Sequence, residues 1–114
     1  LKVIPQPGGD FEVIEARGEG ARGMWCAAAD FAMARNPANG QRLYVKKPRG
    51  PSVSVAGRKG VTFTVDAARL GVSPTQALSV SVRSAGQGLP LHHAFQFCRD
   101  YQIELNDILL RRGG

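Results

Sequence analysis

The sequence predicts a single α+β domain, residues 1–114, in which an antiparallel sheet of about five strands carries two main helices on one face. Three observations lead to this prediction. A chain of 114 residues with 43% hydrophobic and 21% charged residues is typical of one soluble globular domain. Several short segments alternate apolar and polar residues, which indicates strands buried on one side only. Two longer segments have the residue pattern of helices.

The N-terminal third predicts a lead-in, a strand and a helix. Residues 1–9 hold two prolines and two glycines and are expected to be irregular. Residues 11–16 alternate loosely, which indicates a strand. Residues 24–35 are rich in alanine and lack β-branched residues, so they predict a helix, which Asn36-Pro37 ends. Because this helix is apolar on almost every side, we expect it to be the buried packing helix.

The middle of the chain predicts strands at residues 42–47, 52–55, 61–65 and 78–83, with a hairpin turn at 56–60. The side chains expected to point toward the core are Leu43, Val45, Val61, Phe63, Val65, Leu78, Val80 and Val82. The outward side chains are then polar: Arg42, Tyr44, Lys46, Thr62, Thr64, Ser79, Ser81 and Arg83. Residues 66–71 predict one helical turn closed by a glycine.

The C-terminal part predicts the second helix at residues 90–101, with a proline in its first turn. Its apolar residues recur every three or four positions and should face the core. Residues 102–105 are expected to add a final strand, and residues 111–114 are expected to fray.

The two cysteines predict a disulfide. Cys26 lies on the first predicted helix and Cys98 on the apolar side of the second, and two packed helices can bring such positions within bonding distance. Two buried free thiols are the alternative. An even cysteine count is typical of oxidising compartments, and the chain starts at Leu1 rather than at Met. We therefore expect an exported protein, periplasmic or secreted.

A catalytic cysteine is a second interpretation of the same residue. Cys26 lies in the first turn of its helix near Arg22, where the helix dipole favours a thiolate. With Trp25 beside it, this layout resembles papain-like and cell-wall-peptidase thiol hydrolases over these few residues. The resemblance implies a histidine base, for which His92 and His93 are the candidates. Those families place the histidine on a strand, whereas both candidates begin a helix, so we favour the structural role for Cys26.

No cofactor or metal site is predicted. Two cysteines and two adjacent histidines do not have metal-ligand spacing, and the chain contains neither GxxxxGK[ST] nor GxGxxG. No apolar run approaches the ~20 residues that span a bilayer.

A basic block marks the candidate binding surface. Between Phe31 and Val65 there is no Asp or Glu, and the formal net charge of the chain is +6. The candidate anion-binding residues are Arg42, Lys46, Lys47, Arg49, Arg58, Lys59 and Arg83. Partners would be an anionic ligand or an envelope protein. Nucleic acid is not favoured, because Tyr44 is the one outward aromatic residue on the predicted sheet face.

The leading functional hypothesis is a small, exported, disulfide-stabilised binding module that is not an enzyme. A cysteine hydrolase and a module that binds polyanions, either nucleic acid or acidic glycan, are the alternatives. An ordinary solvated basic rim is the structural explanation of the same charges.

Overall fold

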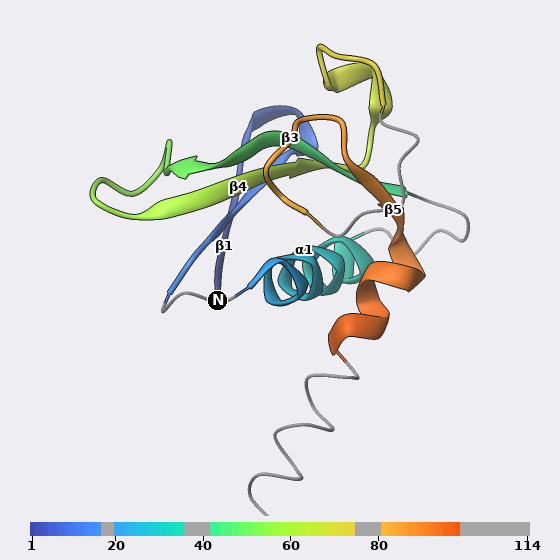
Figure 1. Ribbon diagram of the computed structural model, residues 1–114, viewed down its shortest axis with the longest axis horizontal. Helices are drawn as coiled ribbons and strands as arrows, with labels where there is room; N and C mark the ends of the chain where they lie inside the picture. The colour runs from blue at the N-terminus through green and yellow to red at the C-terminus, as the bar shows by residue number, and fades with distance from the viewer. Residues whose placement is uncertain (17–19, 36–41, 75–80, 99–114) are drawn as a thin grey trace, which may run out of the picture.

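A five-stranded antiparallel sheet with two helices packed on one of its faces forms the protein (Figure 1). The computed structural model describes residues 1–16, 20–35, 42–74 and 81–98. The strands, in spatial order, are β1 (Lys2–Pro5), β2 (Phe11–Ile14), β4 (Lys59–Thr64), β3 (Arg42–Pro51) and β5 (Gly88–Pro90). The helices are α1 (Ala21–Arg35) and residues 91–98. The predicted α+β class, with its sheet and its two helices, is confirmed.

The core lies between the sheet and the two helices. From the strands it contains Phe11, Val13, Leu43, Val45, Val61, Phe63 and Leu89, and from the helices Met24, Trp25, Ala28, Ala29, Ala32, Leu91 and Ala94. The Phe63 ring packs 5.1 Å from Trp25 and 6.1 Å from Phe11, measured between ring centroids. The inward side chains predicted for β3 and β4 are therefore correct. The small alanines of α1 allow the helix to approach the sheet closely.

Helix α1 begins at Ala21, three residues before the predicted start, and passes through Gly23. The Met24 backbone N–H donates to the carbonyl of Gly20 at 3.2 Å, which satisfies one of the first N–H groups. The sequence predicted that this helix is buried on almost every side, and that prediction is wrong. Its solvent side carries Arg22, Asp30, Ala34 and Arg35.

Residues 1–9 are not an irregular lead-in, so that prediction is wrong. Lys2–Pro5 form β1, which pairs with β2, and residues 7–9 form the 3₁₀ turn η1 (Pro7–Gly9). β1 is an edge strand, where a proline such as Pro5 is tolerated because one side of the strand needs no hydrogen bonds. The single turn predicted at 66–71 is confirmed as η2 (Ala67–Arg69), capped by the Asp66 side chain.

Two predicted strands are wrong in their placement. Residues 52–55 form the β3–β4 loop, because the Ser52 side chain accepts hydrogen bonds from Ser54 N and Val55 N and draws this backbone out of the ladder. Of the segment 78–83, residues 81–83 form no strand, and 78–80 lie outside the described residues. The fifth strand is β5 instead. This strand was not predicted because Gly88 is a residue type that favours loops. In the structure Gly88 pairs with Tyr44, and a glycine is needed there because a Cβ would lie 2.6 Å from the Tyr44 ring.

The second helix begins at residue 91. The predictions for residues 102–105 and 111–114 lie outside the described residues.

Candidate functional site

The outer face of the sheet, opposite the helices, is not the flat exposed surface that the sequence predicts. Thr62 and Thr64 on β4 are 5% and 1% exposed, and Glu12 on β2 is 1% exposed. The strand alternation was predicted correctly, but the environment of the outer side chains was not. A layer of charged side chains covers this face.

Two carboxylates that flank β2, Asp10 and Glu15, meet cations from other segments. Asp10 pairs with Lys46 of β3 and, at 3.0 Å, with Arg69 of η2. Glu15 accepts two hydrogen bonds from Arg49 Nη2, at 2.7 and 2.8 Å.

The pairs Asp10–Lys46 and Glu15–Arg49 cross β4, which lies between β2 and β3 in the sheet. Glu12 is opposite Thr62, and Ile14 is opposite Gly60. Since Gly60, Thr62 and Thr64 are small, long side chains from β2 and β3 can reach each other above them. Two cations of β3, Lys46 and Arg49, therefore form ion pairs within the protein.

Asp10 is the most strongly held of these carboxylates. Burial raises the pKa of Asp10, but hydrogen bonds from Arg69, Lys46 and Thr64 outweigh it, so its pKa lies below the ordinary value of 3.8. The group is therefore a charged structural centre that joins η2 and β3.

Glu12 holds the β3–β4 loop. Its carboxylate accepts from Ser52 Oγ at 2.9 Å and from the Val53 backbone N–H at 3.0 Å. Gly60 leaves room for it, because a Cβ there would lie 2.6 Å from Glu12 Oε2. Asp10, Glu12 and Glu15 were not among the residues predicted from the sequence to form a site. The available signal was that Asp10 and Glu12 alternate with the core residues Phe11 and Val13.

A different set of cations remains at the hairpin end of the sheet. Lys47 lies opposite Thr62, Lys59 begins β4, and Arg58 ends the loop and donates to the carbonyl of Glu15 at 3.0 Å. Lys2 lies opposite Ile14, which places it at the same end. All four side chains are exposed, and within the described ranges none of them forms an ion pair with a carboxylate. We call Lys2, Lys47, Arg58 and Lys59 the hairpin basic cluster.

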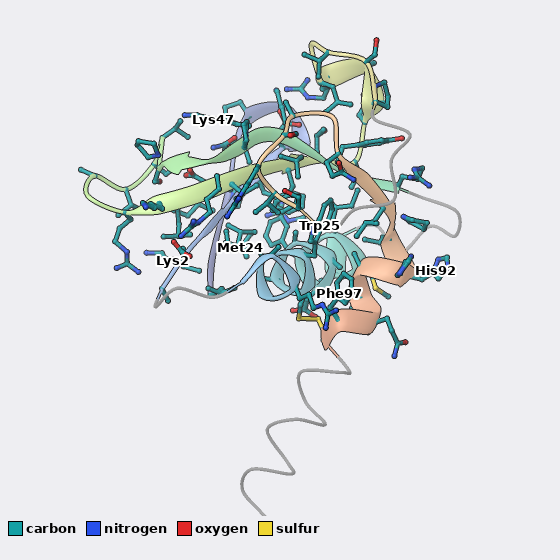
Figure 2. All side chains as sticks on the ribbon, viewed as in Figure 1. Lys2, Met24, Trp25, Lys47, His92 and Phe97 are labelled. Carbon is teal, nitrogen blue, oxygen red and sulfur yellow. A yellow bond between two sulfur atoms is a disulfide. The ribbon has the colours of Figure 1, made fainter. Side chains whose placement is uncertain are left out.

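Figure 2 shows Lys2 and Lys47 on the side of the molecule from which the hairpin extends. Among the other predicted anion-binding residues, Lys46 and Arg49 pair with carboxylates. Arg42 is opposite Pro90 at the far end of β3, and its Nη2 donates to the carbonyl of Gly88 at 3.3 Å. Arg83 is exposed and follows Val82, whose carbonyl accepts from Arg49 N.

The cysteines form the predicted disulfide. Cys26 of α1 and Cys98 are bonded, with their Cα atoms 4.9 Å apart. A bonded Cys26 has no thiolate, which the hydrolase interpretation requires. His92 and His93 are both exposed on the 91–98 helix, and His93 lies against the Phe97 ring, 6.0 Å between centroids. In this oxidised form Cys26 is not available to either histidine as a nucleophile.

Metal-binding clusters and membrane-spanning helices are both absent from the described part of the chain. No group of three or more His, Cys, Asp or Glu side chains is arranged to hold a metal ion there, and no helix there is long and apolar enough to cross a membrane. A pocket of about 200 Å³ lies between α1 and the sheet, and its lining is Gly9, Phe11, Phe31, Ala32, Arg35 and Val65. It contains none of the predicted site residues.

No protein-family model, curated protein or solved structure matches this chain.

Proposed function

We propose that this protein is a non-enzymatic binding module of the cell envelope that binds an anionic partner through the hairpin basic cluster. One observation carries the proposal. The carboxylates near β2 pair with Lys46, Arg49 and Arg69, whereas the cations of the hairpin end are exposed and form no ion pair within the described residues.

Charge separation of this kind favours association with an anion. Cations that already pair with Asp10 and Glu15 would have to break an ion pair before binding, whereas the cations of the cluster would not, and only Arg58 would have to release a backbone carbonyl. The field of several like charges at one end of an elongated sheet also steers an anionic partner toward that end. The protein then needs no catalytic group to act.

Retention on a heparin column tests the proposal. The variant Arg58→Glu/Lys59→Glu should elute at clearly lower salt than the wild type, because two contacts to sulfate groups are lost. The matched control is Arg35→Glu/Arg42→Glu, which changes the net charge equally. Arg42 is at the far end of β3, and Arg35 lies against Phe31 on the last turn of α1.

The control variant should elute close to the wild type. If both variants lose retention equally, only net charge matters and the hairpin site is wrong. If neither variant changes retention, the basic cluster binds no polyanion of this kind.

Location in the envelope is supported by the disulfide, since such bonds persist in oxidising compartments. Fractionation of the source cells, with thiol labelling before reduction, tests it. Recovery of the chain in the cytosolic fraction with two labelled thiols would contradict an exported protein.

A further inference from the structure

The tip of the β3–β4 hairpin combines an uncharged, partly apolar loop with the basic cluster. Residues 51–57 contain no charged residue, and within them Pro51, Val53 and Ala56 are exposed. Val53 is 57% exposed, the highest value among the large hydrophobic side chains of the described residues. Figure 1 shows this loop at one extremity of the molecule. Arg49 precedes the loop, and Arg58 and Lys59 end it.

Internal hydrogen bonds hold the tip in this shape. Buried Glu12 accepts from the Val53 N–H, and Ser52 Oγ accepts from Val55 N at 2.9 Å while donating to Glu12. The backbone of the loop is thereby tied to the sheet, and the Val53 side chain is left pointing away from the core. Exposure of this valine follows from the bonds around it.

We infer that the protein docks on an anionic lipid surface with this hairpin. The inference rests on the proposed function and names the partner of the same cluster. Lys47, Arg58 and Lys59 would contact lipid phosphates, and Val53 would enter the boundary between headgroups and acyl chains.

A lipid surface fits the tip better than a soluble polyanion does. A soluble polyanion can pair with the cations but provides no apolar layer for Val53. An anionic bilayer provides phosphates for the cations and, below them, an apolar layer for Val53 at the tip of the hairpin. The second exposed loop valine, Val72, provides an internal comparison. It is 50% exposed, but the cation of the preceding turn, Arg69, is paired with Asp10.

Cosedimentation with vesicles tests the inference. The probes are vesicles of phosphatidylcholine alone and vesicles of phosphatidylcholine with an equal amount of phosphatidylglycerol. We expect binding to the anionic vesicles only, with weaker binding as salt is raised. Val53→Ser should bind anionic vesicles about fivefold more weakly than the wild type, because an apolar side chain is lost from the interface. Val72→Ser should bind as the wild type does.

The two proposals fail separately. If Val53→Ser and Val72→Ser bind the anionic vesicles equally well, the apolar contact is wrong, and heparin retention still decides the anion site. If the wild type binds heparin but no vesicle, the partner is a soluble polyanion and the lipid inference is overturned. If Arg58→Glu/Lys59→Glu keeps both heparin and vesicle binding, the basic cluster itself is wrong.

Discussion

Asp10 is a buried carboxylate that forms ion pairs with two cations from distant parts of the chain. Its neighbours in sequence are Gly9 and Phe11, and neither indicates a charged centre. Lys46 reaches it across the small outer side chains of β4, and Arg69 reaches it from η2. The residue therefore couples three segments through one group.

Asp10→Asn should lower the free energy of unfolding by about 1–3 kcal/mol at neutral pH, because two partly exposed cations lose their common partner. The pKa of Asp10 is lower in the folded state than its ordinary value of 3.8. The contribution of the Asp10 carboxylate to the free energy of unfolding is therefore complete above about pH 5. It is lost as the pH falls through the folded-state pKa of Asp10. Urea unfolding of both proteins from pH 7 to pH 2.5 measures the difference.

Asp30→Asn serves as the control, since Asp30 is exposed on α1. It should leave stability within about 0.5 kcal/mol of the wild type. A wild-type advantage over Asp10→Asn that stays constant down to the lowest pH would contradict the role given to Asp10.

Gly60 is a second residue whose role depends on a neighbour across the sheet. Gly60→Ala should destabilise the protein by about 1–3 kcal/mol, because the new methyl group displaces the Glu12 carboxylate from the loop. Gly50 is its direct partner on β3, and a Cβ there meets only the Pro48 carbonyl, at 3.8 Å. Gly50→Ala is therefore the matched control and should be close to neutral.

Thermal unfolding compares the two glycine variants, and amide exchange at Val53 reports on the loop. In a Glu12→Ala background the cost of Gly60→Ala should shrink, since the displaced group is gone. An equal cost in both backgrounds would show that Glu12 is not the cause.

At the scale of elements, the disulfide joins the two helices that cover the sheet. The bond closes a separation of 72 residues between α1 and the 91–98 helix. The bond therefore fixes the position of the 91–98 helix relative to α1, which itself packs on the sheet through Met24, Trp25 and its alanines.

Cys26→Ser/Cys98→Ser should lose about 2–4 kcal/mol of unfolding free energy, chiefly because the unfolded chain regains its freedom. Urea unfolding with and without a reductant measures this loss. The reductant should bring the wild type down to the stability of the double variant and leave that variant unchanged. A wild-type midpoint that ignores the reductant would contradict a stabilising bridge.

Strand β4 shows why its inner face was predictable and its outer face was not. The alternation of Val61 and Phe63 with threonines defines which side is apolar, and both are fully buried. The same pattern cannot show that Thr62 and Thr64 are covered too. Their cover comes from β2 and β3, which lie far away in the sequence.

At the scale of the whole molecule, the fold gives the cations of the basic block different surroundings. The basic block is uniform in charge along the chain, and six of its residues, together with Arg83, were equally good candidates for anion binding. Folding pairs Lys46 and Arg49 with carboxylates, places Arg42 at the far end of β3, and leaves Lys47, Arg58 and Lys59 at the hairpin. The candidate binding end results from this sorting.

The sequence by itself determined the α+β class, the inward faces of β3 and β4, the helix around Cys26 and the pairing of that cysteine with Cys98. These follow from local periodicity and from having two cysteines on core-facing helices. Tertiary structure alone decided that residues 2–5 form an edge strand, that the outer face is covered, and which cations remain exposed. The physical reason is that strand pairing and ion pairing depend on neighbours from other parts of the chain, and local spacing does not identify those neighbours.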